Sequence, residues 1–160
     1  MNDPIEPIRT HLAKIDHLLS AAGRDARREG VDEITGTHVI RAILRDAGTH
    51  TVVNEQVRRV LERAFGIAKD SPEETLVSPP EKGFAESGLV LLVASGALKT
   101  LQYHPTVVDC IEAGASFALD DAPAAHKRLL SCLLRSDTQA RDALRNVGED
   151  ADQIAAQLEI

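Results

Sequence analysis

The sequence predicts an all-α fold, a compact bundle of five to eight helices built from two pseudo-symmetric helical repeats. Apolar residues recur at steps of three and four along most of the chain, which is the spacing of one helix face. No segment shows the strict polar and apolar alternation that is typical of a half-buried strand. The apolar fraction of 43% in 160 residues is enough to build one core.

The first half of the chain predicts three helices, over residues 4–29, 38–45 and 53–69. Gly30 follows the first of them, where a left-handed residue commonly ends a helix. Thr35 or Thr37 is expected to cap the second, because a threonine hydroxyl can accept a hydrogen bond from a free N–H of the first turn.

The middle of the chain predicts a linker followed by a buried helix. Residues 70–83 contain three of the seven prolines and show no helical periodicity. Residues 84–101 are apolar almost all round, which favours a helix in the core, ending shortly before Pro105. Its most apolar part, residues 88–98, is much shorter than the ~20 residues that a membrane span needs.

The last third predicts four helices, over residues 107–119, 125–134 and 137–146, with a final one ending at Leu158. The expected caps are Thr106, Ser136 or Asp137, and Asp150 or Asp152. Gly148 is expected to end the third helix of this group. One compact domain therefore divides into a first repeat (1–69), a linker (70–83), and a buried helix with the second repeat (84–160).

The repeat itself is visible in two short apolar segments. Residues 38–44 (HVIRAIL) align with residues 128–134 (RLLSCLL) at an offset of 128 − 38 = 90. Positions two, three, five, six and seven carry small or apolar side chains in both segments. Two such units would bury their apolar faces against each other.

The surrounding residues resemble the amino-terminal double-repeat domain of Clp-type AAA+ unfoldases. Residues 34–44 (ITGTHVIRAIL) match the family segment I-G-T-E-H-L-L-L-G-L-L in length, and residues 129–154 follow the family order without a gap. The resemblance implies a non-enzymatic protein-interaction module that docks a client or adaptor of a Clp unfoldase. The expected binding groove lies near the starts of the two short helices, where N–H groups are free. The candidate partner-binding residues are Thr35, Thr37, His38, His126 and Lys127.

The sequence also departs from the family. No G-x-x-x-x-G-K-[ST] loop is present, so we do not expect this chain to be a nucleotide-driven unfoldase by itself; it is either a fragment of one or a stand-alone relative. Some members use a glutamate in each repeat to bind phosphorylated arginine. Thr37 and Lys127 stand at those positions, so that activity is not carried over.

No motif for catalysis, cofactor binding or metal binding emerges. None of the six histidines has another three or four residues away, the spacing that presents two metal ligands on one helix face. Cys110 and Cys132 stand among helix-forming apolar residues, which indicates two reduced, buried thiols. The first residues lack the basic and apolar regions of a signal peptide, and we expect a cytoplasmic protein without a membrane span.

Two other function classes stay open at this point. A helical DNA-binding or transcription-associated domain, of helix-turn-helix or histone-like type, could use the arginines of two predicted helices: Arg24, Arg27, Arg28, Arg58, Arg59 and Arg63. The net charge of −7 and the aromatic content of 2% argue against nucleic acid as the partner. A small helical enzyme whose site is built from scattered histidines is the third class.

Overall fold

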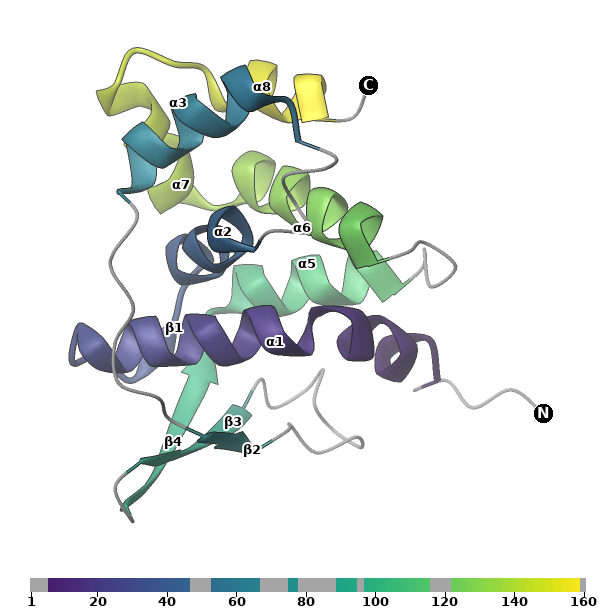
Figure 1. The fold of residues 1–160 in the computed structure, drawn as a ribbon, viewed down its shortest axis with the longest axis vertical. Coiled ribbons are helices and arrows are strands. Elements are labelled where there is room, and N and C mark those ends of the chain that lie inside the picture. The colour runs from purple at the N-terminus through teal and green to yellow at the C-terminus, as the bar shows by residue number, and fades with distance from the viewer. Residues whose placement is uncertain are drawn as a thin grey trace.

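The structure of the chain, a computed structural model, describes residues 6–46, 53–66, 75–77, 89–94, 97–115 and 122–158. Within these ranges the chain forms seven helices and four short strands (Figure 1). The predicted helical character is therefore confirmed in outline, whereas the expectation that the chain contains no strand is wrong.

The first half of the chain forms α1 (Glu6–Arg28), β1 (Glu33–Ile34), α2 (Gly36–Arg45) and α3 (Glu55–Phe65). Gly30 follows α1 with a positive φ of 77°, a conformation that L-residues rarely adopt, so the predicted terminator is confirmed. Thr35, and not Thr37, occupies the cap position of α2. Asn54 caps α3 by accepting a hydrogen bond from the backbone N–H of Gln56.

The helix predicted over residues 84–101 is wrong. Residues Leu89–Ala94 form β3 and residues Ala97–Tyr103 form β4, which pair antiparallel. Val90 and Leu92 are buried between half-buried neighbours, as expected for alternating faces of a strand. A short apolar run between glycines is compatible with a buried strand and with a buried helix, so hydrophobic periodicity alone does not distinguish the strand from the helix. The two-residue spacing between the strands, Ser-Gly in sequence, is typical of a tight hairpin.

The strands form one sheet in the order β1-β4-β3-β2. Of the predicted linker, residues Thr75–Val77 are described and form β2, which pairs antiparallel with β3. β1 pairs parallel with the end of β4, where the His104 N–H donates to the Ile34 carbonyl oxygen at 2.9 Å. This pairing attaches the hairpin to the segment that joins α1 to α2.

The second half forms α5 (Pro105–Ala115), α6 (Ala122–Ser136), α7 (Thr138–Asn146) and α8 (Ala151–Leu158). The expectation that Thr106 caps α5 is wrong, because Pro105 already occupies the first helical position. His104 takes the cap role: its Nδ1 accepts a hydrogen bond from the Thr106 N–H at 3.1 Å.

α6 is longer than the predicted 125–134, whereas the last two helices of this half, α7 and α8, begin and end as predicted. Asp137 caps α7, since its Oδ2 accepts a hydrogen bond from the Ala140 N–H at 2.9 Å. Asp150 does the same for α8 through the N–H of Asp152, at 2.8 Å. Gly148 follows α7 with a φ of 80°.

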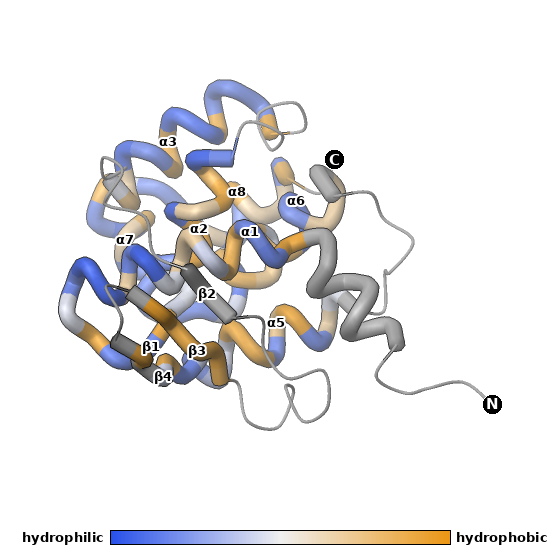
Figure 2. The backbone as a smooth tube through the Cα atoms, turned by 60° about the horizontal axis from the view of Figure 1, so that its bottom comes forward, coloured by the Kyte–Doolittle hydropathy of each residue, from blue (hydrophilic) through white to orange (hydrophobic). Residues whose placement is uncertain are grey.

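The long helix α1 lies between the sheet and the other helices (Figure 1). It contacts β1 and β2 as well as α2, α5 and α6. Hydrophobic residues run along β3, whereas α3 alternates hydrophilic and hydrophobic residues as an amphipathic surface helix does (Figure 2). The largest fully buried side chains come from helices and strands alike: Ile15, Leu18, Ile34, Ile40, Ile43, Leu61, Leu92, Leu101, Ile111, Leu129 and Leu130. No described helix is both long and apolar enough to cross a membrane.

The two halves meet closely where α2 begins and α7 is capped. A Cβ atom added at Gly36 would lie 2.8 Å from Cγ of Asp137. Asp137 is itself buried and holds the first turn of α7. The close approach therefore requires a residue without a side chain at position 36.

Candidate functional site

The five residues that the sequence predicts for partner binding fall into three places. Thr35, Thr37 and His38 lie at the start of α2, where the two threonines are half-buried and His38 is buried. His126 is buried in α6. Lys127, the next residue, lines a surface cavity. The structure thus places three of the five residues at the start of α2 and the other two next to each other in α6.

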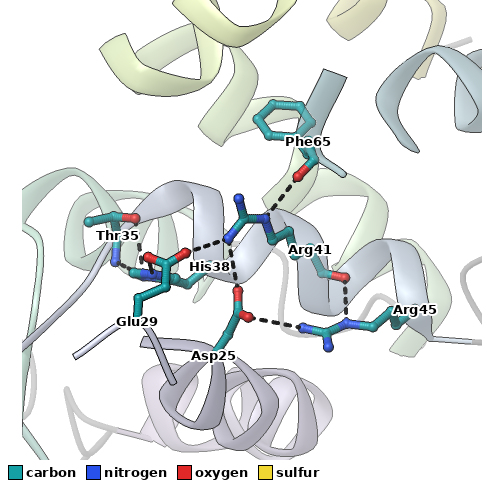
Figure 3. Close-up of polar contacts among 7 residues, drawn as sticks. All are labelled: Asp25, Glu29, Thr35, His38, Arg41, Arg45 and Phe65. Atoms are coloured by element: carbon teal, nitrogen blue, oxygen red, sulfur yellow. Dashed lines mark hydrogen bonds and ion pairs between the residues drawn. The ribbon is translucent and has the colours of Figure 1, made fainter. Parts of the chain in front are cut away.

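His38 ties the start of α2 to the end of α1 (Figure 3). Its Nδ1 accepts a hydrogen bond from the Thr35 backbone N–H at 2.9 Å, and its Nε2 lies 2.8 Å from Oε1 of Glu29. Because Nδ1 accepts, the ring proton is on Nε2 and is donated to the Glu29 carboxylate. Both ring nitrogens are engaged in a side chain that is 3% exposed, so His38 holds the fold together and offers no atom to a partner.

Arg41 completes this network. Its Nη1 lies 2.7 Å from Oε2 of Glu29 and 3.3 Å from Oδ2 of the buried Asp25. Its Nε donates to the carbonyl oxygen of Phe65 at 2.9 Å, which joins the end of α3 to α2. Burial raises the pKa of Glu29, but the hydrogen bonds from His38 and Arg41 outweigh burial and hold this pKa below its usual value of 4.5. The network therefore joins three helices: ion pairs link α1 and the residue after it to α2, and a hydrogen bond links α2 to the end of α3.

Two groups of side chains among the described residues bring three possible metal-ligand atoms within 4.8 Å of one another. The first is Asp25, Glu29 and His38, where the guanidinium of Arg41 already compensates the two carboxylates.

The second group joins α1, the end of α2 and α6. His17 Nε2 lies 2.9 Å from Oδ1 of Asp46, and His126 Nδ1 lies 3.4 Å from Oδ2 of Asp46. Zn²⁺ accepts two imidazoles and one carboxylate as ligands. The same contacts also describe an arrangement without a metal, in which the Asp46 carboxylate bridges the two histidine rings. Helix spacing could not have paired His17 with His126, because the contact forms only when α1 packs on α6.

A cavity of about 420 Å³ opens between α5, α6 and α8. The residues that line it are Cys110, Ala113, Gly114, Ala124, Lys127, Arg128, Ser131, Cys132, Arg135 and Leu158. The side of α5 that faces the cavity carries only small residues, and this leaves the space open. Cavities that bind small ligands or single side chains are of this size.

The charge of this cavity is opposite to that of the whole chain. Lys127, Arg128 and Arg135 border it, and no carboxylate is among its lining residues, although the chain has a net charge of −7. A recess lined by cations and apolar atoms attracts an anion and strengthens its interactions, because the walls exclude water. The cavity is therefore suited to an anionic group that carries an apolar neighbour.

Sequence reasoning identified only Lys127 of this cavity, although a signal for the rest was present. Lys127, Ser131 and Arg135 follow one another at steps of four, and Arg128 and Cys132 form a parallel row one residue further on. Such spacing places all five on neighbouring stripes of one helix face. The sequence could not show that α5 places a face of small residues opposite this part of α6.

Two thiols form part of the cavity wall. Both cysteines are free, but Cys132 is only half-buried, contrary to the expectation of two buried thiols. Its Sγ lies 2.7 Å from Sγ of Cys110. Hydrogen bonding to Cys132, together with burial, raises the pKa of Cys110. The hydrogen bonds from Cys110 and Ser136 outweigh burial and the charge of Asp109 and lower the pKa of Cys132 to about 7.

The arginines of α3, considered above for nucleic acid, are engaged with carboxylates. Arg58 and Arg59 pair with Glu62 and Glu55, each at 2.9 Å, and Arg63 lies 3.5 Å from Glu149. These ion pairs offset the positive charge that a phosphate backbone would meet on this face.

The chain was compared with protein-family models, with curated proteins and with solved structures, and none of the three comparisons gives a match.

Proposed function

We propose that the chain is a non-enzymatic protein-interaction module of the cytoplasm, similar to the docking domain through which a Clp protease unfoldase receives clients or adaptors. The observation that carries the proposal is the cation-bordered cavity between α5, α6 and α8. Free thiols are consistent with a reducing compartment.

The order and packing of the helices support the similarity to a double repeat. α1 contacts α2 and α2 contacts α3, in the same succession as α5, α6 and α7. α2 also contacts α6, and α3 contacts α7, so equivalent helices of the two halves would lie against each other. We propose that the halves are two pseudo-symmetric repeats, with the sheet as an addition that the family pattern lacks.

The cavity chemistry indicates which part of a partner would dock. Arg128 and Arg135 can each hold a carboxylate through two parallel N–H groups, and Lys127 adds a third positive charge. Leu158 and the alanines of the wall would contact an aliphatic neighbour of that carboxylate. We therefore propose an acidic segment of a protein partner, with an apolar residue next to the acidic one, as the occupant.

Of the predicted partner-binding residues, Lys127 keeps a role in this proposal. Thr35 and His38 are engaged with each other at the start of α2, and His126 is buried beside Asp46. Binding through these residues would require that the contacts described above open first.

Fluorescence anisotropy with a labelled acidic peptide, and with the same peptide in which Asn and Gln replace Asp and Glu, tests the docking. We expect the acidic peptide to bind more tightly and its affinity to fall with added salt. The charge reversal Lys127→Glu should weaken binding at least tenfold, or about 1.4 kcal/mol. Arg28→Glu, a reversal at an exposed residue of α1 outside the cavity, is the matched control and should bind as the unchanged protein does. Equal binding of both peptides would overturn the proposed occupant.

The Clp connection needs a separate test. The immobilised chain is incubated with extract of its own cell, and the proteins retained are identified by mass spectrometry. Recovery of a Clp unfoldase, its adaptor or a known client, lost with Lys127→Glu, supports the similarity. Recovery of none of these overturns the connection, whatever the peptide result.

A further inference from the structure

The two thiols of the cavity wall have a geometry that docking does not require. Cys110 lies on α5 and Cys132 on α6, and their Sγ atoms are 2.7 Å apart. The bond length of a disulfide is about 2.05 Å. The two sulfur atoms therefore need to approach by less than 1 Å to form a covalent link, a change that side-chain rotation can provide.

The two sulfur atoms differ in access to solvent and in ionisation. Both cysteines line the cavity, but Cys132 is half-buried whereas Cys110 is only 2% exposed. A thiol with a pKa of about 7 is about half ionised at neutral pH, and Cys132 has this value. Cys110 keeps its proton, and its S–H can donate to the Cys132 thiolate. The more exposed sulfur atom, that of Cys132, is thus the nucleophile. The buried thiol of Cys110 is its hydrogen-bond donor.

The charged groups around the pair come from two helices. Asp109 of α5 raises the pKa of both thiols, and Lys127, Arg128 and Arg135 of α6 border the same cavity. Leu158 is the one residue of α8 among those that line the cavity, and it carries no charge. The Ser136 hydroxyl adds a hydrogen bond that favours the thiolate of Cys132.

We propose that Cys132 and Cys110 form a peroxide-reactive dithiol, which a hydroperoxide such as hydrogen peroxide converts into a disulfide between α5 and α6. The proposal concerns the chain alone and does not depend on the docking of any partner. It makes the cavity wall a site of reversible oxidation.

The reaction proceeds in two steps. First, the Cys132 thiolate attacks one peroxide oxygen; the S–O bond forms, the O–O bond breaks, and the departing hydroxide takes a proton from solvent to become water. Then Cys110 loses its proton and attacks the sulfur of the Cys132 sulfenic acid; the S–S bond forms, the S–O bond breaks, and a second water molecule leaves. The two sulfur atoms give up two electrons, and one peroxide becomes two water molecules.

The direct contact between the sulfur atoms determines the product. A sulfenic acid with a thiol in contact condenses to a disulfide, whereas an isolated one proceeds to sulfinic acid when more peroxide is present. We therefore expect a disulfide as the end product at moderate peroxide excess. Thiol reductants should restore both cysteines.

Mass spectrometry of the full chain after treatment with hydrogen peroxide at pH 7 tests the proposal. We expect the mass to fall by about 2 Da through loss of two hydrogens, with Cys110 joined to Cys132 in the peptide map and no dependence on protein concentration. Cys110→Ser should instead gain about 16 Da and react with dimedone, because the sulfenic acid lacks its resolving thiol. Cys132→Ser should stay unmodified under the same conditions.

Ser136→Ala is the matched variant, since it keeps both thiols and removes one hydrogen bond from the thiolate. We expect its oxidation to be several-fold slower at pH 6 and close to that of the unchanged protein at pH 9, where Cys132 is ionised in both. Circular dichroism before oxidation confirms that each variant is folded. The proposal is overturned if the unchanged chain stays reduced under tenfold peroxide, forms only disulfide-linked dimers, or reacts equally fast when Cys132 is replaced. The unchanged chain alone decides the first two outcomes, so they do not depend on the folding of any variant.

Discussion

The start of α2 and the cavity face of α6 are equivalent segments of the two proposed repeats, yet they use their polar side chains in different ways. In α2, His38 contacts Glu29, and Arg41 contacts both Glu29 and the buried Asp25. Asp25 belongs to α1, and Glu29 is the residue that follows this helix. In α6, the cations border an open cavity. The helix packed opposite makes the difference, because α1 supplies carboxylates to α2 whereas α5 presents small residues and a thiol to α6. The residue types of a segment therefore do not decide whether its polar side chains form an ion-pair network or border a cavity.

The largest expected effect is a loss of stability when the ion-pair network of α2 is broken. Arg41→Ala removes the nearer of two cations beside Asp25, whose side chain is 2% exposed, and leaves this buried carboxylate with the more distant Arg45, whose Nη2 lies 4.0 Å from Oδ1. We expect a loss of about 3 kcal/mol in the free energy of unfolding, since breaking one side of a buried pair is costly. Urea unfolding at pH 7 measures it.

The control for this change is Arg59→Ala, which breaks an ion pair between two exposed side chains on α3. Its cost should be below about 0.5 kcal/mol. If both substitutions cost the same, the α2 network contributes no more than a surface pair, and the contrast between the two segments fails.

The next effect tests whether the two halves are coupled at Gly36. Gly36→Ala would place a methyl group 2.8 Å from Cγ of Asp137 and displace the cap of α7. We expect a cost of about 1–2 kcal/mol, the range of a lost cap. In the background Asp137→Ala the same substitution should cost clearly less, because alanine favours the helix and the contacts with Cγ and Oδ2 of Asp137 are gone, although the Cβ atom of residue 137 still lies 3.1 Å away. Equal costs in both backgrounds would show that the close approach does not couple the halves.

The sequence predicts the local features of this fold well and its long-range features poorly. Gly30, Gly148 and Asp137 act where predicted, because a helix end depends on residues within one turn of it. The β3–β4 hairpin was missed since an apolar run between glycines fits a strand as well as a buried helix. The pairing of β4 with β1, which lies about seventy positions earlier in the chain, is a long-range contact that the local sequence pattern does not contain.

The candidate sites show the same limit. The row of Lys127, Ser131 and Arg135 can be read from spacing alone. The buried state of His38 cannot, because it depends on Glu29 reaching across from the end of α1. The contact between Cys110 and Cys132 likewise requires α5 to pack on α6.

A smaller effect concerns the pH dependence of the α2 network. The pKa of Glu29 is lower in the folded chain than its usual value of 4.5, so the folded state favours the charged form. The stabilisation is therefore complete above about pH 4.5 and is lost as the pH falls through the folded pKa. We expect Glu29→Gln to be less stable than the unchanged chain at pH 6 and to approach it by pH 3, as measured by urea unfolding. A difference that stays constant between these two pH values would contradict the assignment.

The smallest effect on stability is expected in the α6 cavity. Arg128 is exposed at the cavity border. Arg128→Ala should change the free energy of unfolding by less than about 0.5 kcal/mol, whereas Arg41→Ala in the matched segment costs several times more. The same variant should bind the acidic peptide several-fold more weakly, because one of the three cations is gone. A stability loss as large as that of Arg41→Ala would mean that the α6 cations hold the fold as the α2 network does, and the cavity would then be a structural feature instead of a docking site.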